Sequence, residues 1–385
     1  MNITGIIAEY NPFHNGHKYQ LEQAKLSCDA VVVVMSGSFV QRGDVAVFDK
    51  WTRAKYALLN GADLVIELPV CYALNSAERF AYGGVNLLNS LGIVDNICFG
   101  SECGDIELLK KSAYLLDNEP PEVSDKIKKL LDKGQNYPSA REKAFANHIP
   151  PAILSEPNNI LALEYIRHLH RLSSPINPVT VKRHMVGHNC TCANKTFASA
   201  TAIRNMLQDN SDISEYIPYT VDKSFTTYDL SRLDTAMAAH LRLCTKDFLA
   251  NINDVSEGLE NRIISAAQNF SSIREIAENI KTKRYTMSRI NRILLSALLG
   301  LDKNLCTKPP EYIRILGMNK LGRQILSLAK KRASLPIITK TAKFDLTNDM
   351  LKKDILATDI AALCADNPKM RISNKDFLTS PIILM

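Results

Sequence analysis

The spacing of hydrophobic and polar residues in the first half of the chain predicts strands that alternate with helices. Short, almost wholly apolar runs are typical of strands buried on both faces of a parallel sheet, and they occur at residues 3–8, 30–35, 63–68 and 96–99. Alternating apolar and polar residues predict a fifth strand over 179–185. Helical spacing is found at about 16–26, 49–60, 76–91 and 158–172. We therefore predict an α/β fold with a doubly wound parallel sheet of about five strands.

The second half of the chain has a different pattern, which is mostly helical from about residue 216 onward. We expect an α/β domain over residues 1–215 and a mostly helical domain over residues 216–385. In a parallel sheet, ligands gather at the carboxyl ends of the strands. The loops expected at that edge are 9–18, 36–44, 69–75 and 100–105.

Composition is that of an ordinary globular protein, with 46% hydrophobic and 23% charged residues in a chain of 385. No apolar run reaches the ~18 residues of a membrane-spanning helix, and no basic segment precedes the first strand as in a signal peptide. The nine cysteines are scattered and odd in number. We therefore expect a cytoplasmic protein with reduced thiols and no membrane partner.

Positive charge is concentrated in the second half. Residues 1–215 carry 21 Lys and Arg against 23 Asp and Glu, whereas residues 216–385 carry 26 against 17. The net charge of +7 therefore comes from the second half. This asymmetry favours a polyanionic partner such as nucleic acid, and an ordinary solvated basic surface is the alternative.

Segment 10–18, with the sequence YNPFHNGHK, follows the first predicted strand and opens the first predicted helix. Pro12 fixes φ in the turn, and Gly16 lets the backbone approach a ligand closely. The helix N-terminus offers unpaired N–H groups and a partial positive charge, which favour a polyphosphate. His14 and His17 lie one helical turn apart, so both can donate hydrogen bonds to it. The alternative is a helix cap with two exposed histidines.

The strand, turn and helix together resemble the H-x-G-H nucleotidyltransferase superfamily, which transfers adenylate from ATP. The longer string IIAEYNPFHNGHKYQLEQAK resembles one branch, the bacterial tRNA(Met) cytidine acetate ligases, and other stretches extend this resemblance over nearly the whole chain. It implies a Rossmann-like sheet and a catalytic, phosphate-stabilising role for four residues, His14, His17, Lys18 and Arg204. It also implies that ATP is bound by Ile7, Ala8, Glu9, Tyr10, Asn11, Pro12, Phe13, His14, Asn15, Gly16, His17, Lys18, Tyr19, Gln20, Gly100, Asn158, Arg183, His184, Ser199 and Thr201.

The stretch that ends at Arg204, SATAIR, resembles the second signature of the superfamily, I-S-S-T-x-x-R. Hydroxyl groups at the start of a helix can bind phosphate oxygens, and an arginine one turn later can pair with them. Ser and Thr also cap helices routinely, which is the alternative. The sequence leaves open which hydroxyl binds phosphate, that of Ser199 or that of Thr201.

Gly100, Asn158 and Arg183 correspond to nucleotide-contacting positions of the family. Without a side chain, Gly100 lets the backbone press against a nucleotide, although it is also an ordinary turn glycine. The amide of Asn158 can read adenine or ribose, or can cap a helix, and we prefer it to Asn159. His184 is included without a role for its side chain, because the family more often has an apolar residue there.

The tetrapeptide QRGD at residues 41–44 contains an adhesion motif, which we reject because the chain shows no export signal. Related transferases line the site with this loop. Arg42, Lys50 and Arg53 are therefore candidates to hold phosphate or acetate, and a surface position is the alternative for Lys50 and Arg53.

Two groups of His and Cys residues contain the residue types that bind zinc. His188, Cys190 and Cys192 lie close in sequence, and Cys98 and Cys103 form another pair, but neither group has a second dyad at zinc-ligand spacing. We therefore expect no metal site made by protein ligands. Mg²⁺ is expected to accompany ATP, held by phosphates and waters.

A basic stretch at residues 281–292, KTKRYTMSRINR, resembles the family's K-R-Y-T-x-S-R-I stretch and is our candidate tRNA site. Its candidate residues are Lys281, Lys283, Arg284, Tyr285, Arg289 and Arg292. Arg289 and Arg292 can share one helical face toward a phosphate backbone, and Tyr285 can stack on a base. A second basic group contains Lys320, Arg323, Lys330, Lys331 and Arg332. An amphipathic helix with a solvated face is the alternative for both groups.

The resemblance implies a ligase that uses ATP and acetate to acetylate the wobble cytidine of elongator tRNA(Met), through acetyl-adenylate. Two other enzyme classes stay open: a small-molecule adenylyltransferase of cofactor biosynthesis, and an acetate-dependent ligase that acetylates a protein. The intact motif argues against a non-catalytic tRNA-binding module.

Overall fold

The computed structural model describes residues 1–183, 190–192, 195–221, 225–256 and 258–385. An eight-stranded sheet lies at its centre, and seven of the strands follow one another in the order β11-β10-β5-β2-β1-β6-β7, with β12 paired to β10. These strands are β1 (Ile3–Ala8), β2 (Ala30–Ser36), β5 (Leu64–Leu68), β6 (Asn96–Ser101), β7 (Asn177–Lys182), β10 (Ile313–Met318), β11 (Ile337–Ile338) and β12 (Ile382–Ile383). Two short hairpins pair β3 (Phe39–Val40) with β4 (Asp44–Val45), and β8 (Cys190–Cys192) with β9 (Lys195–Phe197).

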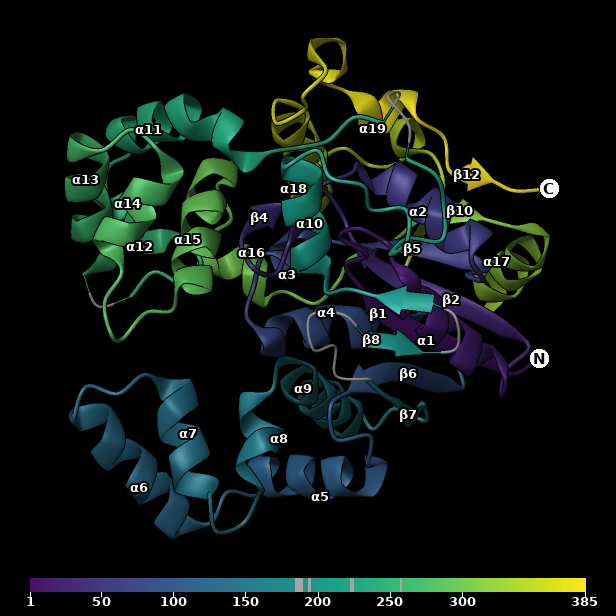
Figure 1. The fold of residues 1–385 in the computed structure, drawn as a ribbon, viewed down its shortest axis with the longest axis horizontal. Helices are drawn as coiled ribbons and strands as arrows, with labels where there is room; N and C mark the ends of the chain where they lie inside the picture. Colours follow the sequence, from purple (N-terminus) through teal and green to yellow (C-terminus); the bar gives the residue numbers. More distant parts are fainter. Residues whose placement is uncertain (184–189, 193–194, 222–224, 257) are drawn as a thin grey trace.

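Helices cover both faces of this sheet, as expected for a doubly wound arrangement (Figure 1). Every residue of β2 is buried, because alternate side chains enter two separate apolar clusters. Val31 and Val33 pack in the cluster that contains residues of α1 and α2, whereas Val32 and Val34 pack in the cluster that contains residues of α4. The helices on the sheet are α1 (Asn15–Lys25), α2 (Lys50–Leu59), α3 (Val70–Ala73), α4 (Ala77–Ser90), α9 (Pro157–Arg171) and α17 (Lys320–Arg332).

Two groups of helices extend away from the sheet (Figure 1). One group is α5 (Ile106–Asp117), α6 (Pro121–Asp132), α7 (Tyr137–Phe145) and α8 (Pro151–Ser155). The other is α11 (Asp234–Leu243), α12 (Lys246–Asn251), α13 (Leu259–Asn269), α14 (Ile273–Ile280) and α15 (Met287–Leu299). The remaining helices are α10 (Ala200–Gln208), α16 (Lys303–Thr307), α18 (Asp349–Ala362) and α19 (Lys375–Leu378).

The α/β class and the parallel order of the five expected strands are confirmed. The sheet does not end near residue 215, however, because β10, β11 and β12 come from the second half of the chain. β10 joins the sheet antiparallel to β5, with Ile315 paired to Ile66. The second half is therefore a bundle, α11 to α15, followed by a segment that completes the central sheet.

A buried group of charged side chains connects this C-terminal segment to the sheet. Lys50 Nζ lies 2.8 Å from Glu67 Oε1 and 2.8 Å from Asp376 Oδ1. Arg314 Nη1 lies 3.1 Å from Glu67 Oε2, and its Nη2 lies 2.5 Å from Asp376 Oδ1. Lys50 is fully buried, so it is neither a surface residue nor a ligand for substrate anions, in contrast to the sequence analysis. Its charge is compensated by two carboxylates distant in sequence.

Within the described parts of the chain, no helix is both long enough and apolar enough to cross a membrane.

Candidate active site

In the turn between β1 and α1, backbone N–H groups hold the rings of the two histidines in place. His14 is the N-cap of α1, and its Nδ1 accepts a hydrogen bond from the Gly16 N–H at 3.0 Å. The Nδ1 of His17 accepts one from the His14 N–H at 3.3 Å. The two rings stack with their centroids 3.7 Å apart. Because each Nδ1 is an acceptor, a neutral imidazole carries its proton on Nε2. Both Nε2–H groups therefore remain available as donors.

The electrostatic surroundings keep both histidines neutral. Burial lowers the pKa of His14 to about 3, and the positive charges of Arg183 and Arg204 add to the effect. Burial, then His14 and Arg183, hold the pKa of His17 well below its ordinary value. Protonating both stacked imidazoles would place two positive charges side by side, which is energetically unfavourable. The pair therefore offers hydrogen-bond donors with fixed directions rather than two positive charges.

We expect ¹⁵N NMR of the free protein to show both His14 and His17 as neutral Nε2–H tautomers from pH 8 down to at least pH 5. His14 has a folded pKa of about 3 against an ordinary 6.5, so the unfolded chain takes up a proton that the folded protein does not, and folding becomes less favourable as the pH falls from 6.5 toward 3. A signal from either residue that titrates near pH 6.5 in the folded state, or an Nδ1–H tautomer, contradicts the geometry described above.

The backbone before His14 has an unusual conformation and is bonded to the segment that follows β4. Tyr10 has a φ of 50°, and the Asn11–Pro12 peptide bond is cis. The Oδ1 of Asn11 accepts a hydrogen bond from the Val47 N–H at 2.8 Å. The rings of Tyr10 and Phe13 are fully buried, so their side chains pack under the turn. Any nucleotide contact by these two residues would be through the backbone.

Arg53 binds backbone carbonyl groups at the carboxyl ends of β1 and β2. Its guanidinium donates to the carbonyl of Glu9 at 2.6 Å, to that of Ser36 at 3.0 Å, and to that of Gly37. The side chain is fully buried and so it connects the ends of β1 and β2. The expectation that Arg53 is a surface residue or an anion ligand was wrong, because carbonyl groups already occupy its donors.

Arg204 lies against the turn and bonds the hydroxyl of Thr201. Arg204 Nη1 donates to the Asn11 carbonyl at 2.8 Å, and Nη2 donates to Thr201 Oγ1 at 3.1 Å. Ser199 is the N-cap of α10, and its Oγ accepts from the Ala202 N–H at 3.1 Å. The Ser199 hydroxyl thus has a capping role, whereas Thr201 is exposed and bonded to Arg204. This favours Thr201 as the phosphate-binding hydroxyl, which stays a prediction.

Three further candidates for nucleotide contact, Gly100, Arg183 and Asn158, lie at the ends of β6 and β7 and at the start of α9. A Cβ at Gly100 would lie 3.1 Å from Arg183 Cγ, and the Arg183 N–H bonds the Ser101 carbonyl at 2.8 Å. Asn158 Nδ2 donates to Glu102 Oε1 at 2.5 Å. Gly100 therefore makes room for the Arg183 side chain, while Glu102, which the sequence analysis missed, holds Asn158.

Asn159 is fully buried and is bonded on both sides of its amide, which supports the preference for Asn158. Gln20 donates to the Cys98 carbonyl at 3.3 Å, so its amide is turned toward β6. His184 and His188 lie outside the described residues. In the part of the chain that the structure describes, no group of three or more His, Cys, Asp and Glu side chains is arranged to hold a metal ion.

The sequence also missed two connections between distant segments, made by three hydrogen bonds, that hold this region together. The side chain of Asn15 donates to the Glu215 carbonyl at 2.9 Å, and its N–H bonds the Tyr216 carbonyl at 2.9 Å. Glu9 Oε1 accepts from the Gln41 N–H at 2.6 Å. Both connections span many residues of sequence and leave no local signal. They fix the start of α1 and the loop after β3.

The basic stretch of residues 281–292 is only partly available to a partner. Lys281, Lys283 and Arg284 are exposed, but Tyr285 is 7% exposed and lies under the Arg289 guanidinium, 5.1 Å from its ring centroid. Tyr285 therefore cannot stack on a base in this conformation. Arg289 and Arg292 both pair with Asp254, at 3.1 Å and 3.4 Å.

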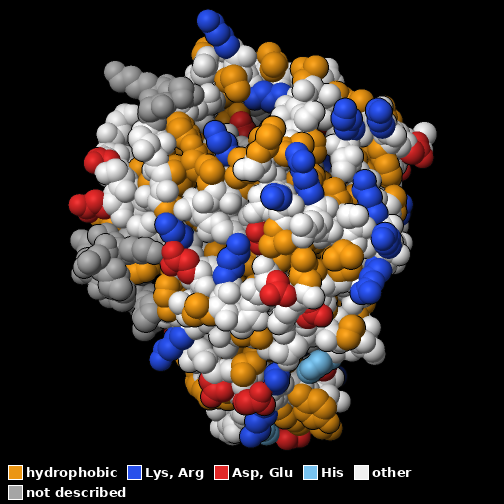
Figure 2. Space-filling view, turned by 90° about the vertical axis from the view of Figure 1, so that its right-hand side faces the viewer, with side chains coloured by type: hydrophobic (Ala, Val, Ile, Leu, Met, Phe, Trp, Pro, Cys, Tyr) orange, Lys and Arg blue, Asp and Glu red, His pale blue; other side chains and the backbone are white. Residues whose placement is uncertain are grey.

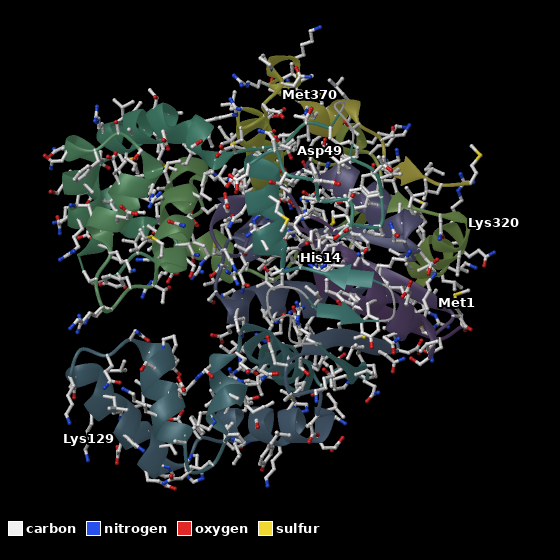
Figure 3. The ribbon with its side chains drawn as sticks, in the orientation of Figure 1. Met1, His14, Asp49, Lys129, Lys320 and Met370 are labelled. Atoms are coloured by element: carbon white, nitrogen blue, oxygen red, sulfur yellow. The ribbon has the colours of Figure 1, made fainter. Side chains whose placement is uncertain are left out.

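The second basic group lies on α17, away from the first. All five of its Lys and Arg residues are exposed, and Figure 2 shows the face of the molecule that carries this helix, with basic side chains along one side. In Figure 3, Lys320 lies at one end of the molecule and α15 toward the other, with His14 between them. The two basic groups therefore do not form one continuous patch.

The chain is similar over its whole length to enzymes of known class. The model of the family described as HIGH nucleotidyl transferase matches residues 1–376. A tRNA(Met) cytidine acetate ligase of Clostridium kluyveri is 44% identical over 412 residues, covering 100% of this chain and 99% of the relative. One of Clostridium novyi is 44% identical over 405 residues, covering 100% of both. The crystal structure of Thermotoga maritima TmcAL bound with alpha-thio ATP matches with a TM-score of 0.90 and 35% identity, covering 100% of both chains.

Proposed function

The chain belongs to the HIGH nucleotidyl transferase family and, within it, to the tRNA(Met) cytidine acetate ligases, and from this membership we propose that it acetylates the wobble cytidine of elongator tRNA(Met). Acetate attacks the α-phosphate of ATP, which forms acetyl-adenylate and releases pyrophosphate. The exocyclic amine of the cytidine then attacks the acetyl carbon, which forms N4-acetylcytidine and releases AMP.

The observation that carries this proposal is the pair of neutral, stacked imidazoles at the N-terminus of α1. Their two Nε2–H donors and the helix N-terminus suit an anion that gains charge as pyrophosphate leaves. Arg204, bonded to Asn11 and Thr201, brings a positive charge to the other side of the turn. Lys18 lies on the first turn of α1, next to His17, and completes the phosphate-binding group. Both chemical steps then depend on positioning and on charge stabilisation.

Mg²⁺ and acetate are parts of the same proposal. We propose that Mg²⁺ accompanies ATP, held by phosphates and water, as is usual for this ion. Acetate is small, so most of the binding energy and specificity comes from the nucleotide and the tRNA. We infer a cytoplasmic site of action, where tRNA and ATP are both present.

The exposed cations Lys281, Lys283 and Arg284 support a tRNA contact on the bundle of α11 to α15. Each phosphate contact releases counterions, so tRNA affinity should fall steeply with salt. A small-molecule adenylyltransferase would show no such dependence. Arg289 and Arg292 remain candidate tRNA contacts in this proposal, although their guanidinium groups already pair with Asp254 within the protein.

We expect the purified protein to transfer label from [¹⁴C]acetate to unmodified elongator tRNA(Met) only when ATP is present. The labelled nucleoside should be N4-acetylcytidine, identified after digestion by chromatography and mass spectrometry. Label in protein, or in a small molecule, would move the acceptor to one of the two other enzyme classes. Absence of both tRNA labelling and acetate-dependent ATP–pyrophosphate exchange contradicts the proposal as a whole.

A further inference from the structure

The loop between β3 and β4 is held from two opposite sides. On one side, its Gln41 N–H donates to Glu9 Oε1 at 2.6 Å, next to the turn that carries His14. On the other side, Arg292 Nη1 of α15 donates to the Gln41 carbonyl at 3.3 Å. One residue of this loop therefore connects the active-site turn with the helical bundle.

Gly43 lets the loop lie directly on α15. Its φ is +76°, and a Cβ at this position would lie 2.6 Å from the backbone nitrogen of Arg292. The left-handed conformation is strained for any residue with a side chain, and here the neighbouring backbone also leaves no room. Glycine is thus required for this contact between the loop and the bundle.

Arg292 is committed to this contact rather than to solvent. Its side chain is 12% exposed, and its Nη2 lies 3.4 Å from Asp254 Oδ2. Asp254 Oδ1 also pairs with Arg289 Nε at 3.1 Å. The carboxylate therefore orients the guanidinium that reaches Gln41. A continuous series of contacts runs from Asp254 through Arg292 and Gln41 to Glu9.

Arg42 lies between Gln41 and Gly43, the two residues that hold the loop, and has an exposed side chain. It directly follows Gln41, whose N–H donates to Glu9 Oε1 beside the active-site turn. Burial raises the pKa of Glu9, and Arg204, Arg53 and Arg42 oppose the rise. Burial lowers the pKa of Arg204, and Arg42 lowers it further. Lys50 and Arg53 are fully buried with internal partners, so Arg42 is the remaining candidate of the three to meet a substrate anion.

We propose that Arg42 binds phosphate oxygens of ATP and that Asp254 and Arg292 position it through the backbone of Gln41. A guanidinium presents paired donors that match a phosphate group, whereas its placement needs an ordered backbone. Arg292 is then a positioning residue for the nucleotide site, besides any part that it has in tRNA binding. The proposal rests on the proposed function only in taking ATP as the nucleotide.

The test is a double-mutant cycle on ATP affinity, measured by calorimetry with ATP and Mg²⁺ but without acetate or tRNA. We expect Arg42→Ala and Arg292→Gln each to weaken ATP binding by at least ~10-fold, and Arg42→Ala/Arg292→Gln to be no weaker than Arg42→Ala alone. Gly43→Ala, which changes no charge, should weaken binding in the same direction. Arg274→Gln on α14 removes one exposed charge from the same bundle and should leave ATP affinity unchanged.

Acetate-dependent ATP–pyrophosphate exchange on the same proteins separates this inference from the proposed function. An Arg42→Ala protein that binds ATP within twofold of wild type overturns the inference, as does a double mutant whose losses multiply. An Arg292→Gln protein with normal ATP affinity and weakened tRNA binding would make Arg292 a tRNA contact alone, which also overturns it. A wild-type protein that binds ATP but transfers no acetate contradicts the proposed function without changing the result of the cycle. Thermal unfolding of each variant identifies any loss that is due to misfolding.

Discussion

Replacing His17 with alanine is expected to lower acetate-dependent ATP–pyrophosphate exchange by roughly 10²–10³-fold. The substitution removes one of two Nε2–H donors that are held by stacking and by the His14 backbone. The donor acts on charge that develops on the leaving pyrophosphate, so kcat should fall more than the KM for ATP rises. The assay follows exchange of labelled pyrophosphate into ATP without tRNA.

Both histidines take part in the capping box of α1, but His14 is the N-cap itself, so His17→Ala disturbs the helix start less and is the cleaner of the two histidine tests. His17→Gln should recover part of the rate, since an amide can both accept from the backbone and donate to phosphate. His170→Ala removes an exposed imidazole from α9 and serves as the matched control. An exchange rate in His17→Ala equal to that of the control would remove this residue from the chemistry.

The strand, turn and helix around His14 could be predicted because their determinants are local. An apolar run, a proline, a glycine and two histidines lie within 16 residues of one another, and each acts through its own backbone or its nearest neighbours. The same holds for Arg204 and Thr201, which occupy one turn of α10. Local patterns therefore predicted β1, β2, β5, β6 and β7 and the candidate phosphate-binding residues around the turn.

Features that depend on distant partners had no local signal. β10 reads as an isolated apolar segment among helices, and only its pairing with β5, about 250 residues earlier, makes it part of the sheet. Lys50 and Arg53 were expected at the surface or at a ligand because an unpaired charge is costly to bury. Their compensating groups are spread over the chain, as with Asp376 for Lys50.

In the basic stretch of residues 281–292, distant partners make side chains less available than the sequence suggested. Its family resemblance implied a tRNA site, with a solvated amphipathic helix as the alternative, yet Tyr285 is buried, and Arg289 and Arg292 share Asp254 as a partner. Asp254 lies outside the stretch, so the pattern gave no sign of it. Sequence composition identifies which side chains can bind a polyanion, whereas packing decides which of them are available.

Replacing Asp376 with alanine is expected to lower the free energy of unfolding by about 3–5 kcal/mol, the usual cost of breaking a buried ion pair by removing one partner. Among the described residues, Glu67 would remain as the ion-pair partner of both Lys50 and Arg314, with the Asp354 carboxyl also nearby. Urea unfolding followed by circular dichroism measures the change. Glu278→Ala, which breaks an exposed pair with Arg274, should change stability too little to resolve.

The loss of unfolding free energy in Asp376→Ala should depend on the charges of the neighbouring side chains and on pH. Burial raises the pKa of Asp376, but Lys50 and Arg314 outweigh it and hold the pKa below its ordinary 3.8. Its contribution is therefore present at neutral pH and is lost as the pH falls through the folded pKa, so the mutant and wild type should converge in acid. The double mutant Lys50→Met/Asp376→Ala leaves Arg314 paired with Glu67 and should be less destabilised than the two single losses added together. Strict additivity would mean that these side chains do not act as one network, and the C-terminal segment would then be held to the sheet chiefly by β10.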